Sequence, residues 1–147
     1  VVALLVGGII SGFLVSRDGL KKWILPMALA INLPDLLYVW MAATTPSSPL
    51  FISICVAIEQ LGYGFGFTAY MLYLIYIADG EHKTAHYAIG TGFMALGMMI
   101  PGMPAGWIQE HIGYTYFFIW VCICTIPGII AAWMIHKRLD DSFGRKV

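Results

Sequence analysis

Five long apolar segments, separated by short polar stretches, constrain this chain more than any other feature. They run over residues 1–16, 23–43, 50–78, 85–108 and 114–135. A helix needs roughly 20 apolar residues to cross the hydrocarbon of a bilayer, and the four segments after the first approach or exceed that length. Because lipid offers the backbone no hydrogen-bond partner, such segments cross as helices. The sequence therefore predicts an all-α, polytopic membrane helix bundle that forms one unit over residues 1–147, with a polar tail at 136–147.

Composition and motifs exclude several other classes of protein. The chain is 60% hydrophobic and only 11% charged, whereas a soluble domain carries about 25% charged residues. Eight basic residues balance eight acidic ones, so no excess of positive charge favours a nucleic-acid partner. No phosphate loop, nucleophile elbow or zinc-finger pattern is present, so we expect neither an enzyme nor a cofactor. His82 and His86 have a metal-ligand spacing, but no third ligand is near in sequence, so no metal is expected.

The first apolar segment is too short to cross a membrane by itself. Residues 1–16 span about 24 Å as a helix, whereas the hydrocarbon is roughly 30 Å thick. The chain also opens at Val1, inside the apolar run and without an initiator methionine. We therefore interpret the segment as the second half of a truncated transmembrane helix. We expect the bundle to pack against the missing N-terminal helices of the same protein.

The basic residues predict how the chain is oriented in the membrane. If the five segments cross alternately, every Lys and Arg falls on one side: Arg17, Lys21, Lys22, Lys83, Lys137, Arg138, Arg145 and Lys146. The loops at 44–49 and 109–113 carry none. Basic loops remain cytoplasmic, so we expect a multi-pass membrane protein with a cytoplasmic C-terminus and with lipid as its surroundings.

Glycine and proline interrupt the third and fourth segments. Gly62 and Gly66 lie in the third segment, and Pro101 and Pro104 lie in the fourth. Interrupted spans are typical of transporters, where they mark binding sites or moving parts, so we expect these residues to bend the helices. The alternative is an inert kink in a static bundle. Glycine pairs four residues apart (Gly8 with Gly12, Gly62 with Gly66, Gly102 with Gly106) also predict close helix packing.

Two carboxylates lie deep in the apolar segments. Asp35 and Glu59 both fall near the middle of the bilayer, where a charge is costly and needs a partner, water or a proton. On a helical wheel, Glu59 shares one face with Tyr63, Tyr70 and Tyr73, so we propose these five side chains as candidates for a substrate and proton pathway. Two alternatives are that the tyrosines only pack helices and that Asp35 bonds the backbone freed by Pro34.

The loop after the first segment resembles the signature of the major facilitator superfamily, Gly-x-Leu-x-Asp-Arg-x-Gly-Arg-Lys. Residues 12–22 read GFLVSRDGLKK, so that Gly12, Arg17, Gly19 and Lys21 match in kind, while Ser16 stands in place of the signature Asp. In that family the signature joins two helices on the cytoplasmic side. The resemblance implies that this chain corresponds to helices 8 to 12, the C-terminal part of a twelve-helix carrier.

Three later stretches are similar to the AmpG-type muropeptide permeases, which belong to the peptide/acetyl-coenzyme A/drug transporter group. They are GYGFGFTAY at 62–70, TAHYA at 84–88 and PAGWI at 104–108. This resemblance implies proton-coupled uptake of cell-wall sugar-peptides, small-molecule solutes, across a Gram-negative inner membrane. It also implies that the third segment lines the central cavity, which favours Glu59 and the tyrosines over Asp35. The alternatives are a facilitator of another solute (a drug, a sugar or an acyl-coenzyme A) and a non-transporting membrane scaffold.

Overall fold

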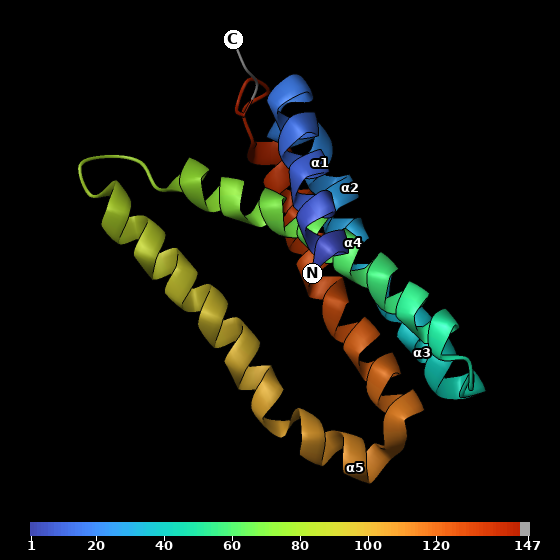
Figure 1. Ribbon diagram of the computed structural model, residues 1–147. Coiled ribbons are helices and arrows are strands. Elements are labelled where there is room, and N and C mark those ends of the chain that lie inside the picture. Colours follow the sequence, from blue (N-terminus) through green and yellow to red (C-terminus); the bar gives the residue numbers. More distant parts are fainter. Residues whose placement is uncertain (145–147) are drawn as a thin grey trace.

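The computed structural model describes residues 1–144, which form helices and contain no strand (Figure 1). The elements are α1 (Val2–Asp18), α2 (Leu20–Asn32), α3 (Asp35–Thr44), α4 (Pro49–Ile77) and α5 (Lys83–Arg138). The prediction of an all-α chain is confirmed.

Two of these elements depart from a single straight helix. Pro34 follows the end of α2 and has no N–H to donate, so α2 and α3 form one apolar stretch with an interruption at residues 33–34. Within α5, Gly113 has φ 78° and ψ 164°, which is not helical. Figure 1 shows that the two halves of α5 run in opposite directions. α5 is therefore two helices joined by a sharp turn.

Three stretches of the described residues are long and apolar enough to cross a membrane: Leu20–Thr44, Pro49–Ile77 and Lys83–Arg138. The last has 56 residues and would be about 84 Å long if it were straight, far more than the roughly 30 Å of hydrocarbon. The chain is a multi-pass membrane protein. Its division into five crossings remains a prediction.

α4 is in close backbone contact with α1 and α2 through glycine. A Cβ atom added to Gly62 would collide with the carbonyl of Ala30, and one added to Gly66 would collide with the carbonyl of Met27. On the α1 side, Gly64 meets the carbonyl of Leu4 in the same way. In lipid, small residues allow helix backbones to approach closely. The pair Gly62–Gly66 thus occupies the kind of contact that its spacing predicts.

The other two glycine pairs have more space around them. A Cβ atom on Gly12, Gly102 or Gly106 would meet nothing within 4 Å, and one on Gly8 would make only ordinary contacts at 3.8 Å and beyond. The close approach on α1 is made by Gly7, against the carbonyl of Leu61. The four-residue spacing of Gly8 and Gly12 therefore did not identify Gly7, the glycine of α1 that the packing requires.

The buried core lies at one end of the bundle. Its members come from α1, α2, α4 and the segment after α5: Val15, Leu20, Ile24, Met27, Ala69 and Leu139. Leu20 and Met27 are fully buried. In a membrane, packing of this kind, and not removal from water, holds helices together, so this end is where the described helices are packed most tightly.

The two halves of α5 pack very differently. The first half leaves the bundle (Figure 1) and exposes large apolar side chains, among them Met103 with 79% and Phe93 with 69% of their surface accessible. The second half returns beside α2 and α3, and the Thr115 hydroxyl donates to the carbonyl of Ala42 at 3.3 Å. α5 therefore contributes to the bundle mainly through its second half.

The basic residues of the described part of the chain gather at one end of the molecule. The α1–α2 turn, the α4–α5 turn and the segment after α5 lie toward one end in Figure 1, whereas the α3–α4 turn and the turn between the two halves of α5 lie toward the other. All six basic residues of the described part of the chain belong to the first end: Arg17, Lys21, Lys22, Lys83, Lys137 and Arg138. Which face of the membrane this end occupies remains a prediction.

Candidate functional site

The two carboxylates that lie deep in the apolar segments come near each other where α3 meets α4. Asp35 stands in the first turn of α3, immediately after the interruption at Pro34. Glu59 lies in α4, and both residues are half-buried. The Tyr38 side chain, three residues after Asp35 on α3, contacts Glu59. Tertiary packing thus combines into one polar site two residues that the sequence places 24 positions apart.

Tyr38 connects α3 to Glu59. Its hydroxyl donates to Oε2 of Glu59 at 3.4 Å, and the Gln60 side-chain amide donates to the same oxygen at 2.8 Å. The Tyr38 ring is stacked on Phe118 from the second half of α5, with ring centroids 5.5 Å apart and planes inclined by 16°. The site therefore has walls from α3, α4 and α5. We name the group Asp35, Tyr38 and Glu59 the carboxylate cluster.

The sequence analysis did not single out Tyr38. Its spacing from Asp35 carried the signal, since residues three apart on a helix lie on neighbouring positions of one face. The Asp35 carboxylate accepts no hydrogen bond from the backbone or from another side chain within residues 1–144. The alternative in which Asp35 bonds the backbone freed by Pro34 is therefore not observed.

The predicted tyrosine face is divided between two cavities. The Tyr63 ring is stacked on Phe67, with centroids 5.6 Å apart, and lines a cavity of about 410 Å³ beside α1. Tyr70 and Tyr73 line a different cavity of about 310 Å³ among α2, α4 and the second half of α5. One face of α4 therefore lines two different cavities along its length. A role for these three tyrosines in contacting a solute remains a prediction.

The predicted bending residues lie within regular helix. α4 continues from Pro49 to Ile77 across Gly62 and Gly66, and both glycines are buried against α2. Pro101 and Pro104 lie inside the helical first half of α5. The backbone of α5 departs from helical geometry at Gly113 and not at these prolines. Their involvement in bending during a functional cycle remains a prediction.

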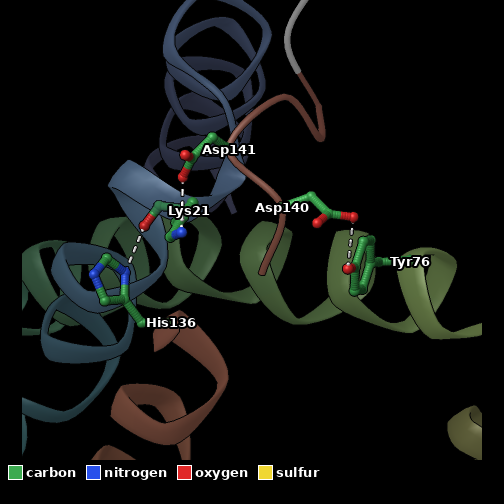
Figure 2. Close-up of polar contacts among 5 residues, drawn as sticks. All are labelled: Lys21, Tyr76, His136, Asp140 and Asp141. Carbon is green, nitrogen blue, oxygen red and sulfur yellow. Dashed lines mark hydrogen bonds and ion pairs between the residues drawn. The ribbon is translucent and has the colours of Figure 1, made fainter. Parts of the chain in front are cut away.

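The turn with the signature-like sequence has a backbone that requires glycine. Gly19 has φ 89°, a conformation that side chains with a Cβ rarely adopt, and an added Cβ would lie 3.1 Å from the carbonyl oxygen of Asp141. Lys21 forms an ion pair with Asp141, with Nζ 2.7 Å from Oδ1 (Figure 2). Gly12 and Arg17 are exposed, so of the four signature residues Gly19 and Lys21 are the two that contact the tail.

The segment after α5 ties this turn to α4. The Tyr76 hydroxyl donates to Oδ2 of Asp140 at 3.0 Å, and Nδ1 of His136 lies 2.8 Å from the Lys21 carbonyl (Figure 2). The backbone N–H of Leu20 donates to the carbonyl of Phe143 at 2.9 Å. Residues that the sequence analysis treated only as a polar tail therefore form an ordered connection between helix ends.

No metal centre or disulfide is seen in the described residues. No three His, Cys, Asp or Glu side chains between residues 1 and 144 are grouped to hold a metal ion. Cys55, Cys122 and Cys124 are free thiols.

The sequence is similar to AmpG-type transporters along almost its whole length. It is 23% identical to the AmpG 1 transporter of Rickettsia felis over 140 residues and 24% identical to that of Rickettsia bellii over 141 residues. It is also 23% identical to the anhydromuropeptide permease of Escherichia coli K12 over 138 residues. The resemblance inferred from the sequence is thus confirmed, and the relatives are transporters, not enzymes.

The matches cover 94–96% of this chain but only 28–34% of these relatives. The chain therefore spans about a third of the length of the curated relatives that it matches. No protein-family model and no solved structure matches it.

Proposed function

We propose that this chain is part of a secondary active transporter of the major facilitator superfamily, equivalent to the C-terminal helices 8 to 12 of an AmpG-type permease. The observation that carries the proposal is the similarity to transporters over 95% of the chain. The apolar helices and the paired carboxylates within them support it, because ionisable residues inside a membrane protein usually mark a pathway for a solute or an ion.

In this proposal the carboxylate cluster carries the proton that drives transport. Two carboxylates close together in an apolar bundle repel each other when both are charged, and burial also disfavours the charge. One proton relieves both costs, so the cluster can take up a proton on one face of the membrane and release it on the other. The Tyr38 hydroxyl and the Gln60 amide, which both donate to Glu59, hold the carboxylate in place between these steps.

The proposed solute is a cell-wall sugar-peptide. This assignment follows the name of the Escherichia coli relative, an anhydromuropeptide permease. Tyr63, on the face of α4 next to Glu59, offers a flat ring and a hydroxyl to a sugar or a peptide group. Proton-coupled uptake would take place across the inner membrane, with the basic end of the bundle and the C-terminus in the cytoplasm.

The decisive experiment separates proton coupling from binding. Glu59→Gln keeps the shape and the hydrogen bonding of the side chain but removes its titration. We expect proton-driven accumulation to fall at least about tenfold, equivalent to about 1.4 kcal/mol. Exchange of solute without a gradient should persist, because exchange involves no net movement of protons. Both activities are measured in vesicles that contain the full-length transporter.

Glu110→Gln provides the matched control. Glu110 is an exposed carboxylate of α5 outside the carboxylate cluster, and its substitution should leave both accumulation and solute exchange unchanged. Accumulation at the wild-type level in Glu59→Gln would refute the coupling role. Loss of exchange as well as accumulation would make Glu59 a contact of the solute instead of a carrier of protons.

A further inference from the structure

Two adjoining cavities form one crevice between α4 and the second half of α5. The inner cavity has a volume of about 310 Å³ and the outer one about 230 Å³. Both are lined by Tyr73, Ala131 and Ile135, so the crevice continues from the middle of the helices to the basic end of the bundle. Its size is in the range of small-molecule sites.

The inner part of this crevice is apolar. Small side chains open it on both helices, with Gly66 and Ala69 on α4 and Gly128 and Ala132 on α5. The amide of Asn32, which also lines it, already donates to the carbonyl of Ala28 at 2.6 Å. A sugar-peptide placed here would lose the water bound to its polar groups without gaining partners, which is costly. A hydrocarbon chain has no polar groups, so it enters the crevice without this desolvation cost.

The outer part of the crevice ends at a positive charge. Arg138 lines it together with Tyr76 and Leu139, and the guanidinium forms no ion pair within the described residues. The nearest acidic neighbour in sequence, Asp140, accepts the hydroxyl of Tyr76 (Figure 2). Arg138 stands in the last turn of α5, where the apolar part of this helix ends, and long basic side chains at helix ends reach the membrane interface.

We propose that this crevice binds one anionic phospholipid, with an acyl chain along the inner part and the phosphate at Arg138. The apolar interior matches the chain, and the guanidinium matches the charge of the head group. Basic pockets between membrane helices bind anionic head groups in this manner. The site goes beyond transport and assigns Tyr70 and Tyr73 to the lipid instead of to the solute.

The test compares two lipids with identical acyl chains. Native mass spectrometry of the purified protein measures binding of phosphatidylglycerol, which is anionic, and of phosphatidylcholine, which carries no net charge. We expect phosphatidylglycerol to bind about fivefold more tightly. Arg138→Gln should remove this preference. Lys137→Gln is the matched control, because Lys137 has the same charge one residue away but stacks on the Trp133 ring at 3.5 Å.

A second pair of variants tests the apolar part. An added Cβ at Gly128 would meet nothing within 4 Å, so Gly128→Leu fills the crevice without displacing the backbone and should weaken binding of both lipids. Gly92→Leu makes the same exchange on the first half of α5, where there is also open space, and should leave binding unchanged. Circular dichroism verifies that all four variants fold.

Three results would overturn the proposal. The first is equal binding of the two lipids by the wild-type protein. The second is an equal loss of preference in Arg138→Gln and Lys137→Gln, since the charge of the whole helix end would then act without a site. The third is displacement of phosphatidylglycerol by glycerol phosphate at matched concentrations, which would make the site one for free anions.

Discussion

Among single residues, Tyr38 determines how Glu59 is held in the carboxylate cluster. Its hydroxyl is the one side-chain donor that reaches Glu59 from α3 within the described residues. Its ring packs on Phe118, so that one side chain joins three helices. The contact of 3.4 Å is at the long end for a hydrogen bond, and we therefore expect a modest energy.

Tyr38→Phe removes this hydrogen bond and keeps the ring stacking. Hydrogen bonds between side chains of membrane helices contribute about 0.6 kcal/mol on average and up to about 1.7 kcal/mol, and the variant should be less stable by an amount in this range. Thermal unfolding of the purified protein measures the loss. Tyr116→Phe, at a position with 70% of its surface exposed, should have no effect, and equal stability of the two variants would contradict the contact.

Asp18 gives a pH-dependent contact at the α1–α2 turn. The indole N–H of Trp23 donates to Oδ2 of Asp18 at 3.2 Å and does most to lower the pKa of this carboxyl, while partial burial opposes the shift and Lys22 adds to it. A group with a lowered pKa stabilises the folded state above its ordinary value of 3.8 and loses that contribution as the pH falls through the folded value.

We therefore expect the indole N–H proton of Trp23 to keep its chemical shift in NMR spectra from neutral pH down to the ordinary value of 3.8. Below that value the signal should move as the carboxyl is protonated and the bond weakens. Asp18→Asn should abolish the titration of this signal. A shift that is already complete between pH 7 and 5 would contradict the assignment.

At the scale of elements, packing of α4 on α2 depends on the absence of side chains. Gly66 is buried against the carbonyl of Met27 and the side chain of Ile31. Because backbone cannot yield as a flexible side chain does, a methyl group here forces the two helices apart. The sequence analysis predicted that Gly66 bends α4. A substitution at Gly66 tests whether the residue is needed for close packing of α4 on α2.

Gly66→Ala should destabilise the protein by about 1–3 kcal/mol, the usual cost of overpacking a well-filled contact. Gly92→Ala meets open space and should be neutral or stabilising by up to about 1 kcal/mol, because alanine is the better helix former. Denaturation of the purified protein, followed by circular dichroism, compares the two. Equal stability of the variants would show that α2 and α4 do not meet at Gly66.

At the scale of the whole molecule, the basic residues at one end predict its orientation. We expect reporter fusions after Lys22, after Lys83 and at the C-terminus to be cytoplasmic, and fusions at Ser47 and Gly113 to lie outside. The physical reason is that basic loops are not translocated. Activity of paired cytoplasmic and periplasmic reporters measures each position. An external location for Lys83 would break the alternation of the five segments.

By itself the sequence determined the kind of molecule. In lipid, a long apolar segment forms a helix because its backbone groups must bond to one another. The all-α fold therefore followed from composition and segment length. The residues of the signature-like turn and of the stretch at 62–70 identified the transporter relatives, and hydropathy alone identified Asp35 and Glu59 as deep carboxylates. These inferences depend on the local chain and on the solvent around it, and both can be read from the order of residues.

Tertiary structure alone decided which groups meet. The partnership of Tyr38 with Glu59, the division of the tyrosine face between two cavities and the contact of Asp141 with Lys21 all join residues from different helices. Helix periodicity states which side chains share a face, but not the neighbour that the face receives, because a neighbour depends on crossing angles and on the close approach that Gly64 and Gly66 allow.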